Sequence, residues 1–111
     1  MALLTAQVVD LDGTAVTFAA CAGGGDTVRW TNDLVIRVRN ADASPHTVTI
    51  DCPATCSFGL AANAAHDLAV VVAAGAEQDI FVGQEKFKLA ADGLVYITYT
   101  AVTSMTVAAT R

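Results

Sequence analysis

Alternation of apolar and polar residues is the feature that most limits how this chain folds. In the segment 34–40 (LVIRVRN), Ile36 and Val38 fall on one side of an extended strand, and Arg37 and Arg39 fall on the other. A period of two is typical of a β-strand with one buried face and one solvated face. No segment of useful length shows the helical period of 3.6 residues. The pattern therefore predicts an all-β chain.

Eight segments carry this strand pattern, and glycine, asparagine, aspartate or proline turns such as AGGGD and NADASP separate them. The expected strands cover residues 15–18, 28–31, 34–40, 46–51, 67–72, 78–82, 94–100 and 105–109. Seven to eight short strands at this spacing indicate an antiparallel β-sandwich, immunoglobulin-like or jelly-roll-like. Helix is confined at most to a turn at 84–90.

The chain length predicts one β-sandwich domain over residues 1–111. A chain of 111 residues that is 54% apolar can bury a core without disulfide or metal support. Its first nine residues, MALLTAQVV, are short and apolar. They have two interpretations, an extended arm that adds to a strand or groove of another subunit, or the first edge strand. The segment 94–111 predicts two strands that tie the C-terminal end into the fold.

Charge and hydropathy argue against nucleic acid and membrane as partners. The net charge is −5 and the chain has only six basic residues, too few for the phosphate contacts that drive nucleic-acid binding. Arg29, Arg37 and Arg39 form the one basic cluster, which suits a solvated face or ion pairs with a neighbouring subunit. No apolar run reaches the roughly 18 residues of a membrane span, and no secretory signal pattern opens the chain. We therefore expect a protein that is made and kept in the cytoplasm, or released from it without secretion.

The segment NADASPHTVTI resembles the first half of a cupredoxin copper site, with His46 in the position of the first ligand. A blue-copper site also needs a cysteine and a second histidine near the C-terminal end. No histidine or cysteine follows position 66. We therefore predict no metal and no cofactor, with His46 at a sheet margin where a strand begins.

Cys52 and Cys56 have the spacing C-x3-C, which matches no zinc motif. Only Cys21, His46 and His66 could complete a site, and their spacing is not that of a zinc protein. The pair is expected at a junction between a strand and a loop. Small buried side chains and a local disulfide both remain open for it.

No arrangement of residues predicts catalysis, so the chain is expected not to be an enzyme. No serine or cysteine shows the strand-turn-helix elbow of an activated nucleophile, and DLDGT lacks the continuation of a calcium or phosphotransfer loop.

Trp30 is predicted in the core, and one of Tyr96 and Tyr99 at the surface. The run DLAVVVA lacks alternation, which indicates a strand covered on both faces, by a second subunit for example, or aliphatic residues left exposed.

Three segments carry a wider resemblance: LVIRVRNADASPHTVTID, VVVAAGAEQDIFVG and DGLVYITYTAVTSMTVAATR. With them the chain resembles the small β-sandwich head decoration (cement) proteins of tailed bacteriophages. The resemblance implies a structural virion protein that is assembled in the host cytoplasm, binds the outside of the capsid and stabilises it. Its implied partners are the major capsid protein and copies of itself.

The candidate partner interface comprises Leu3, Leu4, Val8, Arg37 and Arg39. Two other functions remain as alternatives. One is a β-sandwich module that binds a glycan or a host surface, which would require exposed aromatic residues beside polar ones. The other is a different virion component, such as a tail or neck subunit.

Overall fold

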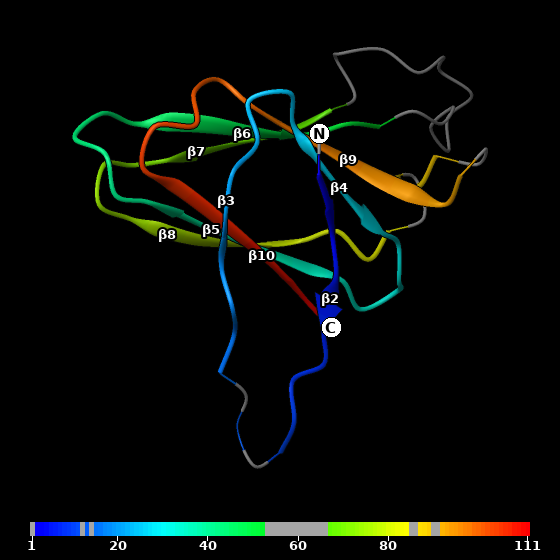
Figure 1. Cartoon of the computed structure of the whole chain (residues 1–111). Coiled ribbons are helices and arrows are strands. Elements are labelled where there is room, and N and C mark those ends of the chain that lie inside the picture. Colours follow the sequence, from blue (N-terminus) through cyan, green and yellow to red (C-terminus); the bar gives the residue numbers. More distant parts are fainter. Residues whose placement is uncertain (1, 12, 14, 53–66, 85–86, 90–91) are drawn as a thin grey trace.

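The computed structural model describes residues 2–11, 13, 15–52, 67–84, 87–89 and 92–111. In these residues ten strands and no α-helix form two packed sheets, shown as two layers in Figure 1. The first sheet has the order β1 (Ala2–Leu4), β4 (Asp26–Arg29), β9 (Leu94–Tyr99), β6 (His46–Ile50) and β7 (Leu68–Val72). The second has the order β2 (Ala6–Gln7), β10 (Met105–Thr110), β5 (Val35–Asn40) and β8 (Glu77–Phe81), with β3 (Ala19–Ala20) also beside β10.

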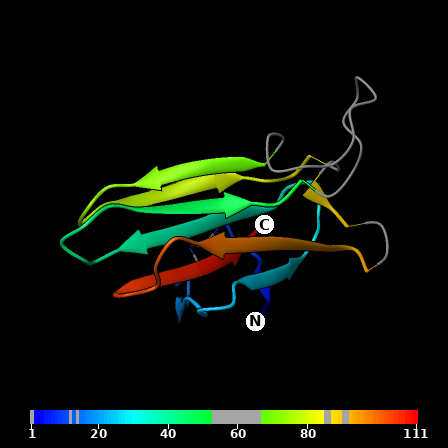
Figure 2. The same ribbon diagram turned by 90° about the horizontal axis from the view of Figure 1, so that it is seen from above.

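The predicted all-β sandwich is confirmed. From above, the strands of the two layers run in similar directions, which is the aligned kind of sheet packing (Figure 2). The seven strands predicted from residue 28 onward all occur, with ends shifted by two residues or fewer. Among the described residues, no helix is long and apolar enough to cross a bilayer.

The N-terminal part of the chain differs from the prediction. Residues 15–18 are not a strand, and pairing with β10 begins only at Ala19. β1 and β2 pair in parallel with β4 and β10, so both sheets are mixed rather than purely antiparallel. The reason is that residues 2–7 cross from the edge of one sheet to the edge of the other, running in the direction of the strands they join.

The core follows the alternation seen in the sequence. Ile36 and Val38 of β5 are fully buried, as are Val48 of β6 and Val95 and Ile97 of β9. Burying one such side chain contributes about 1.5 to 3 kcal/mol, so these inward rows supply most of the force that holds the layers together. The two sheets are thus joined mainly by aliphatic packing.

Two uncertain positions are resolved by the structure. Trp30 is half-buried at the margin of the core rather than inside it, and its Nε1 donates a hydrogen bond of 3.2 Å to the carbonyl of Gln84. On β7, Ala69 is exposed and the side chain of Val71 is 61% exposed, so the outer face of this strand lies open in the chain by itself.

A projecting segment joins β2 to β3 and is the most distinctive feature of the fold. We call residues 8–18 the arm; its described residues are 8–11, 13 and 15–18. Figure 1 shows the arm extending well beyond the sandwich, away from both layers. It leaves from the end of β2 and returns to β3 on the same edge of β10.

Candidate functional site

The base of the arm is fixed by hydrogen bonds. Nε2 of Gln7 donates to the carbonyl of Thr17 and Oε1 of Gln7 accepts from the amide of Thr17, both at 2.9 Å. The amide of Val9 donates to the carbonyl of Arg111 at 3.1 Å, and the amide of Arg111 donates to the carbonyl of Gln7 at 2.9 Å. The two limbs are therefore joined to each other and to the end of β10.

The returning limb is also anchored on the outer face of the second sheet. The guanidinium carbon of Arg39 lies 3.8 Å from the centre of the Phe18 ring, a cation–π contact. Nε of Arg39 donates a hydrogen bond of 2.9 Å to Oε2 of Glu77 on β8. The contact between Phe18 and Arg39 holds the returning limb near the sheet, and the far end of the arm projects beyond it.

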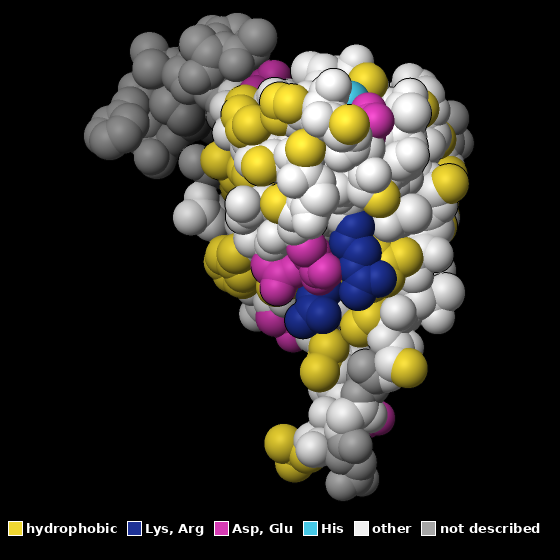
Figure 3. Space-filling view, turned by 90° about the vertical axis from the view of Figure 1, so that its left-hand side faces the viewer, with side chains coloured by type: hydrophobic (Ala, Val, Ile, Leu, Met, Phe, Trp, Pro, Cys, Tyr) yellow, Lys and Arg dark blue, Asp and Glu magenta, His cyan; other side chains and the backbone are white. Residues whose placement is uncertain are grey.

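The arm presents aliphatic side chains to solvent. Six large hydrophobic side chains of the described residues are exposed. Three of them, Val8, Val9 and Leu11, belong to the arm, and Leu11 is 107% exposed; a fourth, Leu3, lies on β1. Figure 3 shows hydrophobic side chains on the projecting arm, below a band of charged residues. An apolar projection that cannot reach its own core is typical of a protein-binding element.

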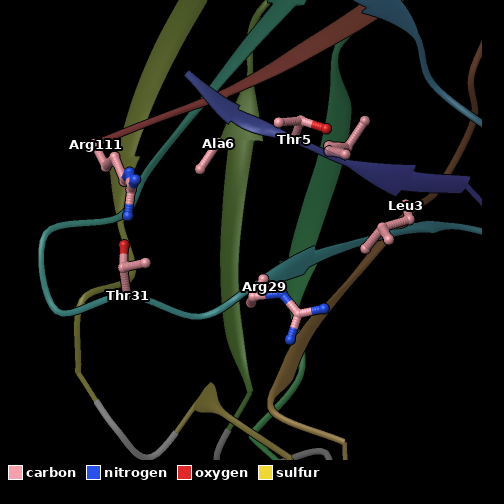
Figure 4. Close-up of a pocket in the computed structure, with 7 residues that line it drawn as sticks. Leu3, Thr5, Ala6, Arg29, Thr31 and Arg111 are labelled. Carbon is pink, nitrogen blue, oxygen red and sulfur yellow. The ribbon is translucent and has the colours of Figure 1, made fainter. Parts of the chain in front are cut away.

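Two shallow grooves flank the segment where β1 crosses to β2. One, of about 240 Å³, is lined by Leu3, Leu4, Thr5, Ala6, Arg29, Thr31 and Arg111. Figure 4 shows Arg111 and Thr31 on one side of this groove and Arg29 and Leu3 on the other. The second groove, of about 300 Å³, shares Leu3, Leu4 and Thr5 and extends along β10 at residues 107–109.

The five predicted interface residues thus lie in two places. Leu3, Leu4 and Val8 lie together along the grooves and the start of the arm, whereas Arg37 and Arg39 lie on the outer face of β5. The two grooves include neither Arg37 nor Arg39.

Arg37 and Arg39 form ion pairs within the chain. Nε of Arg37 lies 3.4 Å from Oδ1 of Asp79, and Nε of Arg39 lies 2.9 Å from Oε2 of Glu77. The register of β5 and β8 places each arginine directly opposite its acid. Arg29 is on β4 in the other sheet, so the basic cluster expected from the sequence does not form. Ion pairing between non-consecutive strands left no local signal in the sequence.

His46 is the first residue of β6 and is largely buried. Its Nε2 lies 2.8 Å from Oδ2 of Asp42. The amide of Ala43 and the imidazole of His46 hydrogen-bond to the Asp42 carboxyl and lower its pKa. Among the described residues, no three histidine, cysteine, aspartate or glutamate side chains group to hold a metal ion. Cys56 and His66 lie outside the described residues. The predicted alternatives for Cys52 and Cys56, a local disulfide or small buried side chains, therefore fall outside them as well.

A buried polar cluster went unnoticed in the sequence. The Tyr99 hydroxyl donates a hydrogen bond of 2.7 Å to Oδ2 of Asp26, and the Ala22 amide donates to the same oxygen at 3.2 Å. Burial, opposed in part by a hydrogen bond with Tyr99, raises the pKa of the nearby Cys21 thiol to about 11. Burial and the hydrogen bond to Asp26 also raise the pKa of Tyr99. Both groups are therefore protonated near neutral pH.

Comparisons with protein-family models, with curated proteins and with solved structures found no significant match. The arm and the adjacent grooves are therefore the candidate functional site on structural grounds alone.

Proposed function

We propose that this protein is a structural virion component that binds the outside of a tailed-phage capsid and stabilises it. The observation that carries the proposal is the arm, which places Val8, Val9 and Leu11 in solvent on a hydrogen-bonded base. The sequence resemblance to head decoration proteins supplies the setting. The proposed partners are the major capsid protein and further copies of the chain.

A fixed arm suits this role energetically. Burying an exposed valine or leucine gains about 1.5 to 3 kcal/mol, and a base that is already ordered lowers the entropy cost of docking. A decoration protein occupies many equivalent sites on one shell. Weak contacts between neighbouring copies therefore add up to strong retention through effective concentration.

The proposal is tested by mixing the purified protein with undecorated shells and measuring co-sedimentation. Saturable binding and a higher temperature of shell disassembly are the expected results, because a ligand that binds only the intact shell stabilises it by mass action. Leu11→Glu should abolish binding. Val71→Glu, which adds the same charge on the exposed outer face of β7, should leave binding intact.

Absence of co-sedimentation by the unmodified chain would count decisively against a decoration role. Equal binding by the Leu11→Glu variant would remove the arm from the interface. Circular dichroism of each variant verifies that the sandwich is folded, so that a loss of binding is not a loss of structure.

A further inference from the structure

Two arginines without acidic partners face the same groove. Of the four arginines that the structure describes, Arg37 and Arg39 are paired with carboxylates, whereas no ion pair involves Arg29 or Arg111. The chain has a net charge of −5, so acids are plentiful, yet both of these arginines line the 240 Å³ groove beside β1. Their shared position indicates a groove that attracts a carboxylate.

The rest of the groove has a matching character. Leu3, Leu4 and Ala6 give it an apolar wall, and Thr31 contributes a buried hydroxyl that has no hydrogen-bond partner in the described structure. Figure 4 shows this hydroxyl directed toward the space beside Arg111. A buried hydroxyl without a partner is unfavourable, and a polar group that reached it would supply the missing hydrogen bond. The groove therefore suits an extended segment with an acid between aliphatic residues.

The arm has this chemistry. Val9, Asp10 and Leu11 are consecutive and all exposed, with a carboxylate between two aliphatic side chains. The arm of the same chain cannot turn back into the groove, because the Val9 amide is bonded to the Arg111 carbonyl and the limb leaves the sandwich from that point. The matching segment must come from another molecule.

We propose that the arm of one copy binds the groove of a second copy, with Asp10 between Arg29 and Arg111 and with Leu11 against Leu3 and Leu4. The arm base and the groove share Arg111, so two copies related by a two-fold axis can exchange arms reciprocally. The inference rests on the proposed function only in treating the arm as an assembly element. It adds that the partner of the arm is the groove of a second copy.

Sedimentation equilibrium of the purified protein without shells tests the inference. The unmodified chain should self-associate, and more weakly at high salt. Asp10→Arg and Arg29→Asp should each raise the dissociation constant about tenfold or more, as expected for close charge pairs across an interface. The double variant Asp10→Arg/Arg29→Asp restores one pair and the original net charge but places the introduced arginine beside Arg111, so it should recover part of the affinity that either single variant loses.

Leu11→Glu and Val71→Glu form the matched control for the apolar contact. The first should yield monomers and the second should associate like the unmodified chain. A monomeric unmodified chain, or a folded double variant that stays dissociated, would overturn the inference. Loss of association in Val71→Glu alone would assign the interface to β7 and would also overturn it.

The shell experiment separates this inference from the proposed function. Monomers that still bind and stabilise shells would disprove the exchange of arms and leave decoration standing. Association that responds to the charge swap, in a protein that never binds shells, would establish the exchange and remove the capsid role.

Discussion

Tyr99 of β9 and Asp26 of the neighbouring strand β4 are joined by a hydrogen bond of 2.7 Å from the tyrosine hydroxyl to Oδ2 of the carboxyl. Asp26 is completely buried, and its other oxygen, Oδ1, has no partner in the described structure. The hydroxyl and the Ala22 amide are thus the two hydrogen bonds that compensate this carboxyl for its removal from water.

Removing the Tyr99 hydroxyl should therefore destabilise the fold strongly. Tyr99→Phe leaves a buried carboxyl short of a donor, and we expect a loss of about 2 to 3 kcal/mol in the free energy of unfolding, measured by urea denaturation. Tyr96→Phe is the matched control, because the Tyr96 hydroxyl bonds to the exposed carboxyl of Asp92. Its loss should stay within about 0.5 kcal/mol. Equal losses in the two variants would contradict this assignment.

Stability should fall at alkaline pH. Burial raises the pKa of Cys21 to about 11 and raises that of Tyr99. An unfolded thiol ionises at about pH 8.5, so the unfolded chain loses its proton first and is favoured as the pH rises. The free energy of unfolding should be level up to about pH 8 and decline from there toward about pH 11. Cys21→Ala should flatten the first part of the decline, and a profile unchanged in that variant would refute the explanation.

The strand pattern was predictable because one buried face imposes a period of two, as on β5 with Ile36 and Val38. The arm was not predictable in the same way. Residues 15–18 carry the alternation of a strand but have no partner strand, and only the positions of β2 and β3 beside β10 reveal the projection. Asp26 is the last residue of the turn sequence AGGGD and looks like a loop residue, although it is the first residue of a buried strand. Neither long-range pairing nor a buried acid leaves a local signal.

Two of the predicted interface residues form ion pairs within the chain that the sequence alone does not reveal. Arg37 and Arg39 are separated from Asp79 and Glu77 by about forty positions, and only the register of β5 with β8 places them opposite each other. The other three predicted interface residues, Leu3, Leu4 and Val8, lie beside the grooves. They are close in sequence, and residues 2–7 run along the edges of both sheets.

Gly25 should tolerate no side chain. Its φ of +94° lies in the left-handed region, and a Cβ there would lie 2.5 Å from the carbonyl oxygen of Ile97. Gly25→Ala should cost more than about 2 kcal/mol, from backbone strain and from the forced separation of β4 and β9. Gly23→Ala is the control, since nothing lies within 4 Å of its Cβ position. Thermal unfolding of both variants is the measurement, and a neutral Gly25→Ala would disprove the close approach.

The ion pair between Arg39 and Glu77 should contribute little to stability. Its side chains are 54% and 40% exposed, and pairs screened in this way are typically worth about 0.2 to 1 kcal/mol. Glu77→Gln should therefore lower the free energy of unfolding by less than about 1 kcal/mol, with a smaller effect in high salt. A double-mutant cycle with Arg39→Ala isolates the pair from the contact between Arg39 and Phe18. A coupling above about 2 kcal/mol would show a stronger pair than its exposure predicts.

Truncation should separate the roles of the two ends of the chain. β10 is a central strand, paired with β5 on one side and with β2 and β3 on the other, so removing residues 105–111 takes away the middle of the second sheet. That variant should lack a cooperative unfolding transition. Removing residues 2–4 deletes only the edge strand β1, which pairs with β4 alone, and should leave a folded but less stable protein. Circular dichroism with urea titration distinguishes the two, and a cooperative transition after loss of residues 105–111 would contradict the central place of β10.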